Sequence, residues 1–179
     1  MKSNKKNYKA FVSYAHADKF YFDVLMRGIK THSDSDGLDI SWDVWEDTRI
    51  PIGEDWNKFI QKEVQECDFA ILLISGNFLF SKYIKDQELR QFILRDYNDE
   101  FFIFPILIDP CNFTKEKELA QKQFFICSGE EYGLPNIEDL TYADLVRITI
   151  EGVILPNPNR ERYHMNLVEK MLESIKHHI

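Results

Sequence analysis

Short apolar runs alternate with amphipathic segments along most of the chain. Residues 9–14 (KAFVSY), 69–75 (FAILLIS) and 101–109 (FFIFPILID) have the length and the β-branched and aromatic content of strands. Residues 38–45 (LDISWDVW) alternate apolar and polar side chains, which is typical of a strand with one buried face. Residues 124–128 (FFICS) indicate a fifth strand. The unbroken run FAILLI predicts a strand that is buried on both faces of a parallel sheet.

Apolar residues recur at helical spacing between and after these runs. This period predicts helices at 19–31, 56–64, 85–97 and 141–154, and a last helix at 161–179 beyond the breaker LPNPN. Short polar side chains stand where the first two helices begin, and such residues favour N-caps because their oxygens accept hydrogen bonds from free backbone N–H groups. These predicted caps are Asp18 and Asp55.

Strands that alternate with helices imply βαβ units, because parallel neighbours need a crossover connection. We therefore expect an α/β fold with about five parallel strands, helices on both faces and an additional C-terminal helix. Pro105 has no N–H group, which predicts that its strand lies near a sheet edge or contains a bulge. Ligands of such sheets bind at the carboxyl ends of the strands. Functional residues are therefore expected in the loops 15–18, 46–55 and 75–88.

Length and composition predict one folded domain. The 179 residues, of which 44% are hydrophobic and 14% aromatic, suffice for one core of ordinary size. We expect an N-terminal tail at 1–7 and the domain at 8–155. A linker and a C-terminal helix at 156–179 are expected to pack on the domain or to extend from it.

Charge and cysteine content narrow the expected setting. The net charge of −8 disfavours nucleic acid and anionic membranes as partners. The three cysteines form no CxxC pair, so neither a disulfide framework nor a thiolate zinc site is expected, and a reducing cytoplasm fits best. The longest apolar run, at 101–108, is shorter than the ~18 residues that span a bilayer. We expect a cytoplasmic protein without a membrane anchor.

Several common catalytic motifs are absent from the sequence. It contains no GxGxxG after the first strand, no glycine-rich loop ending in Lys-Ser or Lys-Thr, no HExxH and no GxSxG. Its five histidines have no cysteine partners at zinc-binding spacing. We therefore expect neither a bound cofactor nor a metal centre.

Aromatic and charged residues remain at the expected carboxyl edge of the sheet. Together they suit a flat, charged, nucleotide-like ligand through stacking and hydrogen bonds to sugar hydroxyls. Each also has an ordinary structural role, and a carboxylate in a first helical turn gains about 0.3 to 1 kcal/mol from the helix dipole alone. The residues by themselves favour that structural role for Glu88. The set comprises Tyr14, His16, Trp45, Asp47, Arg49, Tyr83 and Glu88.

Four segments, in this order, resemble the motifs of the bacterial branch of the Toll/interleukin-receptor (TIR) domain family. KAFVSYAHAD at 9–18 resembles the first motif, a Phe-x-Ser-Tyr strand end followed by a polar loop. VWEDTRIPIGEDW at 44–56 resembles the second motif, with the BB loop at 47–54. FAILLISGNFLFSKYIKDQEL at 69–89 and FPILIDPCNF at 104–113 are similar to the third and fourth. The resemblance implies the flavodoxin-like TIR fold.

The resemblance also implies a site around Glu88, which matches the glutamate that cleaves NAD in active members of the family. Those members usually place an aromatic residue four positions before the glutamate. Here Ile84 holds that position and Tyr83 lies five before Glu88, so either side chain could face the nicotinamide. The other substrate-binding residues that the resemblance implies are Tyr14, Ala15, His16, Trp45, Asp47 and Arg49.

Two functions follow from the resemblance. The first is cleavage of NAD to nicotinamide and either ADP-ribose or a cyclic ADP-ribose isomer, in bacterial antiviral defence with a separate effector that binds the messenger. NAD is then the substrate, and one carboxylate suffices because nicotinamide leaves as a neutral molecule from a cationic centre. The second is a non-catalytic scaffold that acts by homotypic contacts through the BB loop at 47–54. The presence of Glu88 favours the first.

Overall fold

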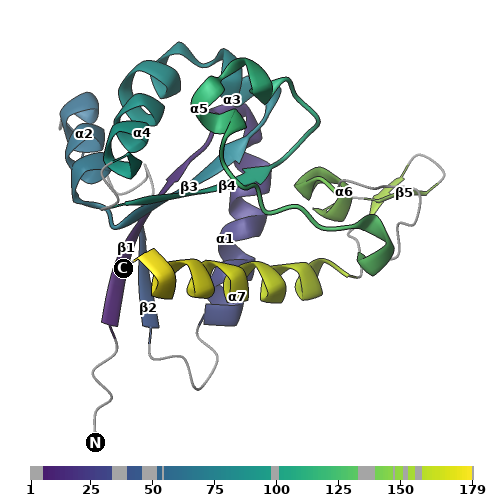
Figure 1. The fold of residues 1–179 in the computed structure, drawn as a ribbon. Coiled ribbons are helices and arrows are strands. Elements are labelled where there is room, and N and C mark those ends of the chain that lie inside the picture. The colour runs from purple at the N-terminus through teal and green to yellow at the C-terminus, as the bar shows by residue number, and fades with distance from the viewer. Residues whose placement is uncertain are drawn as a thin grey trace, which may run out of the picture.

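A parallel sheet of four strands forms the centre of the protein (Figure 1). In the computed structural model the strand order is β2-β1-β3-β4, and each neighbouring pair is parallel. The predicted α/β fold, with helices on both faces and a C-terminal helix, is confirmed. The strands are β1 (Lys6–Ser13), β2 (Ile40–Trp45), β3 (Phe69–Ile74) and β4 (Phe102–Leu107). The structure describes residues 6–33, 40–45, 52–53, 55–97, 101–132, 140–146, 148–150, 153–155 and 159–178.

Two layers of helices enclose the sheet, each over its own apolar core. The first layer comprises α1 (Lys19–Ser33), α6 (Tyr142–Val146) and α7 (Arg160–His178). The second layer comprises α2 (Trp56–Glu66), α3 (Gly76–Phe80), the π turn η3 (Ile84–Leu89), α4 (Arg90–Asp96) and α5 (Lys117–Ala120). The described residues also contain the short 3-10 turns η1 (His16–Asp18), η4 (Phe113–Lys115) and η5 (Gly129–Tyr132).

β3 lies inside the sheet and is buried on both faces, as its unbroken apolar run predicts. Phe69, Ile71 and Leu73 enter the core of the first layer, and the alternate residues enter the core of the second. This division follows from the strand geometry, because successive side chains point to opposite faces of the sheet. β3 therefore joins the two cores and fixes the spacing of the two layers.

Pro105 lies in β4, an edge strand of the four-stranded sheet. This agrees with the edge position that was predicted from its lack of an N–H group. The predicted fifth strand at 124–128 is wrong as a strand, because it is reduced to a single parallel bridge between Ile106 and Phe125. The Pro105 carbonyl accepts a hydrogen bond of 3.1 Å from the Phe125 N–H. Pro105 has no N–H to donate in return, so no further hydrogen bond forms on the N-terminal side of this bridge.

The predicted helix at 141–154 is also wrong. α6 ends at Val146, and the chain continues as the antiparallel pair β5 (Ile148–Ile150) and β6 (Val153–Leu155). The sequence RITIEGVIL is dense in β-branched residues, which lose side-chain freedom in a helix and favour strands. Ile148 pairs with Leu155 and Ile150 with Val153. The apolar period there was compatible with both structures.

α7 packs across α1 and completes the core of the first layer (Figure 1). The helix confirms the prediction for 161–179, and its residues Leu167, Met171 and Ile175 are fully buried. Close approach depends on Gly28 of α1, because a Cβ atom at that position would lie 2.2 Å from Nδ1 of His164. The His164 ring is buried, its Nε2 lies 2.8 Å from the Tyr142 hydroxyl, and burial lowers its pKa to about 4.

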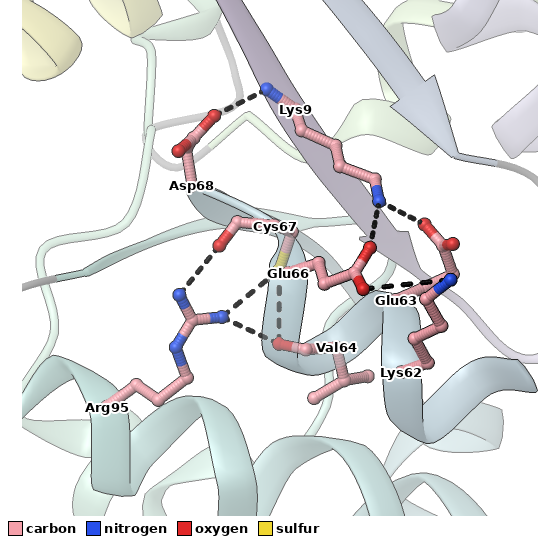
Figure 2. Close-up of polar contacts among 8 residues, drawn as sticks. All are labelled: Lys9, Lys62, Glu63, Val64, Glu66, Cys67, Asp68 and Arg95. Carbon is pink, nitrogen blue, oxygen red and sulfur yellow. Dashed lines mark hydrogen bonds and ion pairs between the residues drawn. The ribbon is translucent and has the colours of Figure 1, made fainter. Parts of the chain in front are cut away.

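Polar contacts tie the C-terminal end of α2 to β1 and α4 (Figure 2). The Lys9 ammonium lies 2.8 Å from a Glu63 carboxylate oxygen and 3.1 Å from one of Glu66. From α4, the Arg95 guanidinium donates hydrogen bonds of 2.6 and 2.7 Å to the carbonyls of Val64 and Cys67. These carbonyls belong to the last turn of α2, which lacks intrahelical partners for them. Both ion pairs and carbonyl contacts therefore fix where α2 lies against the sheet.

The N-terminal end of α2 begins as predicted, with Asp55 as its cap. The Asp55 carboxylate accepts a hydrogen bond of 3.2 Å from the Lys58 N–H. In the part of the chain that the structure describes, no helix has the length and apolar content needed to cross a bilayer.

The α1–α7 contact can be tested with Gly28→Ala. A helical Gly→Ala change ordinarily stabilises a protein by roughly 0.5 to 1 kcal/mol. At Gly28 we expect the opposite, a loss of about 1 to 3 kcal/mol in the free energy of unfolding, because the new methyl group overlaps the His164 ring. Gly76→Ala is the matched control, since its added Cβ would meet no atom within 4 Å. Urea unfolding measures both, and equal stability of the two variants would contradict this packing.

Candidate active site

Glu88 lies in a buried position beside the carboxyl end of β1. Its side chain is in η3, only 6% of the residue is exposed, and its Oε2 accepts a hydrogen bond of 2.5 Å from the Ser13 hydroxyl. Ser13 is the last residue of β1, and 75 positions separate it from Glu88. The fold therefore brings the predicted catalytic glutamate to the edge of the sheet where ligands of parallel α/β proteins bind.

The predicted helix at 85–97 starts as a π turn rather than an α-helix. The Arg90 N–H donates to the Lys85 carbonyl, five residues earlier. A π turn rotates less per residue than an α-helix, so residues five apart come closer to a common side. Tyr83 is thereby brought near Glu88, although five positions separate them. Such turns absorb one additional residue and are frequent at functional sites.

Tyr83 and Ile84 take different places around this turn. Ile84 is buried in the core of the second layer. The Tyr83 hydroxyl donates a hydrogen bond of 3.0 Å to Asn57, and its ring lies 4.6 Å from that of Trp56. Burial and the nearby carboxylate of Glu88 raise the pKa of Tyr83 to about 12. Tyr83 thus supports the start of α2, and Ile84 supports the core.

Burial shapes the acid–base behaviour of Glu88. Removal from water raises the pKa of its carboxyl group to about 7, and the hydrogen bond from Ser13 opposes this shift. No cation pairs with Glu88 among the residues that the structure describes. A carboxyl group that titrates near pH 7 can accept or release a proton under physiological conditions.

Glu88 opens into a small pocket between the end of β1 and the start of α2. Its volume is about 40 Å³, well below the ~150 Å³ of a protein cavity that binds benzene. Two aromatic or ionisable side chains from the first motif, Tyr14 and His16, line it together with Ser13. Trp56 forms its outer wall and is 42% exposed.

The remaining predicted site residues of the first motif flank this pocket. Tyr14 is half-buried, with its ring stacked on Phe22 at 4.2 Å. Ala15 is buried in the core of the second layer, next to the pocket-lining residues. His16 is exposed, and its ring meets that of Tyr14 edge to face at 6.2 Å. Tyr14 and His16 therefore line the pocket, whereas Ala15 packs in the core, and the binding of substrate by these three residues stays a prediction.

The predicted site residues of the second motif lie largely outside the described residues. Trp45 ends β2, but the position of its side chain is not part of the description. Asp47 and Arg49 fall in the range 46–51, which is likewise not described. Their assignment as substrate-binding residues stays a prediction.

Two site residues were missed by sequence reasoning. Trp56 begins the helix predicted at 56–64 and was not among the predicted site residues, yet it lines the pocket. Ser13 was recognised only as part of the Phe-x-Ser-Tyr motif, and its contact with Glu88 joins residues far apart in sequence. A strand whose last inward-facing residue is a serine, after Phe11 on the same face, was the available signal.

Asp18 holds the loops of the carboxyl edge together. It was predicted as the N-cap of α1, but this is wrong for its carboxylate, which accepts hydrogen bonds of 2.5 Å from Ser75 and 2.9 Å from Asn77. Ser75 in turn caps α3 by accepting from the Phe78 N–H. The loop that carries His16 is therefore fastened to the loop that follows β3. In the described residues, no three His, Cys, Asp or Glu side chains are grouped to hold a metal ion.

Two buried glutamates give a paired test of this environment. Because burial raises the pKa of Glu88 from 4.5 to about 7, an ionised Glu88 costs stability as pH rises through that window. Glu88→Gln is therefore expected to increase the free energy of unfolding by roughly 1 to 3 kcal/mol at pH 8, and by little near pH 4.5. Glu63 is similarly buried but is ion-paired with Lys9, so Glu63→Gln is expected to destabilise. Unfolding curves at both pH values decide this. Destabilisation by both substitutions at pH 8 would contradict the account.

Comparison with known proteins places this chain in a family. Residues 10–146, more than half of the chain, match the family model described as TIR domain. An uncharacterized protein of Sinorhizobium fredii is 29% identical over 58% of this chain and 31% of its own length. A protein of Methanobrevibacter olleyae named "probable 2′ cyclic ADP-D-ribose synthase" is 30% identical over 59% of this chain and 29% of its own length. The chain thus spans about a third of the length of the curated relatives that it matches. On the motifs, the fold and this match together, the chain belongs to the TIR domain family.

Proposed function

We propose that this protein cleaves NAD at the bond between nicotinamide and ribose, with Glu88 as the catalytic carboxylate. The observation that carries the proposal is the burial of Glu88 at the carboxyl end of β1, beside a pocket and with one carboxylate oxygen already bound to Ser13. The other oxygen, Oε1, is left for a ligand. The similarity to a relative named as a cyclic ADP-ribose synthase supports the same chemistry.

A single carboxylate is sufficient for this reaction. The electron pair of the C–N bond leaves with nicotinamide, which departs as a neutral molecule, and positive charge builds on the ribose ring. A carboxylate that hydrogen-bonds the ribose hydroxyls stabilises this charge in the transition state more than in the ground state. Water then adds to give ADP-ribose and a proton, or a hydroxyl of the same molecule adds to give a cyclic isomer and a proton. A group with a pKa of about 7 suits that proton transfer.

Substrate entry requires the pocket to widen. A volume of about 40 Å³ is too small for a nicotinamide ring, since a protein cavity that binds benzene measures about 150 Å³. Trp56 is the wall that can move, because it is partly exposed and begins α2 rather than lying within it. Gly53 precedes it with a φ of 92°, a conformation that residues with a Cβ rarely adopt. We propose that the ring of Trp56 turns outward and stacks on the bound ligand.

The proposal extends to partners of the protein. Homotypic contacts through the BB loop at 47–54 fit the full exposure of the Ile52 side chain, since an exposed apolar group there gains by burial in an interface. Released cyclic ADP-ribose would then act on a separate effector in bacterial antiviral defence. A scaffold without catalysis is the alternative, and it predicts association without nicotinamide release.

NAD cleavage is tested by incubating concentrated protein with NAD and separating the products by chromatography. We expect release of nicotinamide, and a fall in kcat of at least about 100-fold in Glu88→Gln, because the charge that stabilises the transition state is lost. Asp86→Asn is the matched control, since Asp86 is an exposed carboxylate of the same π turn. Turnover of the wild type is expected to rise with pH through about 7 as Glu88 ionises.

The outcomes separate the two functions. Full turnover by Glu88→Gln would reject the catalytic assignment. Absence of nicotinamide release by wild-type protein that self-associates would favour the scaffold. The ratio of ADP-ribose to cyclic isomer identifies which nucleophile captures the ribose.

A further inference from the structure

The Ser13 hydroxyl donates its hydrogen bond to the Glu88 carboxylate and not to a backbone carbonyl. The residue is 1% exposed, and the hydrogen bond from its Oγ to Oε2 of Glu88 measures 2.5 Å. Ser75, the buried serine after the neighbouring strand β3, behaves differently, because its Oγ caps α3 and donates to Asp18. Ser13 caps no helix among the described elements. Its buried polar group is therefore explained by Glu88 alone.

The hydrogen bond from Ser13 orients the carboxylate of Glu88 and also favours its ionised form. A glutamate side chain has three rotatable bonds, and a free carboxylate would present either oxygen to the pocket. Ser13 occupies Oε2 from the strand side, so Oε1 is the oxygen available to a ligand. A hydroxyl donor favours the ionised form of the carboxyl group, and this interaction is strong where water is excluded. Ser13 also lines the pocket, so it lies next to Glu88 and next to the space proposed for the substrate.

We propose that Ser13 is the positioning residue of the site: it fixes the orientation of Glu88, favours the ionised form of its carboxyl group and leaves the other carboxylate oxygen free for the ribose of the substrate. This inference rests on the proposed cleavage of NAD. Ser13 of the first motif thus acts on the carboxylate of Glu88, whereas Tyr14 and His16 of the same motif line the pocket.

The role is first tested without any substrate. Carboxyl-labelled glutamate allows the titration of Glu88 to be followed by carbon-13 NMR, with the Glu88→Gln spectrum as the assignment. In Ser13→Ala we expect the pKa of Glu88 to rise by about one unit, because the donor that favours the charged form is lost. Ser13→Thr keeps a hydroxyl and should restore the titration toward that of the wild type. An unchanged titration in Ser13→Ala overturns the inference, whatever the activity of the protein.

Turnover of NAD gives the second measurement. For Ser13→Ala we expect kcat to fall about tenfold at pH 7 with KM changed less than about twofold, and the acid limb of the kcat profile to move to higher pH with the titration. Ser75→Ala is the matched control, a buried serine at the adjacent strand end that does not contact Glu88, and its acid limb should coincide with that of the wild type. A fall in kcat with the acid limb in place overturns the positioning role.

The titration of Glu88 and the turnover of NAD distinguish failure of the proposed function from failure of the role of Ser13. If the wild type releases no nicotinamide, the proposed function is rejected, while the titration still reports on the contact. If NAD is cleaved but Ser13→Ala titrates and turns over like the wild type, the function stands and the role of Ser13 is rejected. Ser13→Cys, of similar volume and with a weaker donor, replaces Ser13→Ala if the alanine variant does not fold.

Discussion

The burial of the Glu88 carboxyl group against a single hydroxyl is the constraint on which the site depends. Removal from water raises its pKa to about 7, and Ser13 supplies the one hydrogen bond that Glu88 receives within the described structure. An ionised group held in this way costs stability, and such costs are typical of functional sites. The surrounding frame compensates by rigid packing: β1 carries Ser13, and contacts from Lys9 and Arg95 hold α2, which closes the pocket.

The π turn gives this arrangement its register. Family members usually place an aromatic residue four positions before the glutamate, and here the additional residue leaves Tyr83 five positions away. The π turn accommodates that residue, so Tyr83 still lies close enough for the charge of Glu88 to raise its pKa. Its ring and hydroxyl contact Trp56 and Asn57 at the start of α2. Of these two aromatic residues, Trp56 lines the pocket and Tyr83 packs against it.

Much of the fold follows from the period of apolar residues, because burial decides local structure in long segments. β3, α1, α2 and α7 were predicted in this way. The errors lie where the period is short or competes with other forces. The short apolar segment at 124–128 pairs with β4 through one bridge alone, and β-branched residues favour the strands β5 and β6 over the end of the expected helix at 141–154. The contact of Ser13 with Glu88 joins two distant segments, and no local pattern reveals such a pair.

The most direct test of the account is a crystal structure of the protein with an NAD analogue whose bond to nicotinamide cannot be cleaved. The account predicts that one carboxylate oxygen of Glu88 lies within hydrogen-bond distance of a hydroxyl of the nicotinamide ribose. Ser13 should remain on the other oxygen, and the ring of Trp56 should have moved to admit the ligand. An analogue bound elsewhere, with Glu88 still enclosed and not in contact with it, would contradict the account.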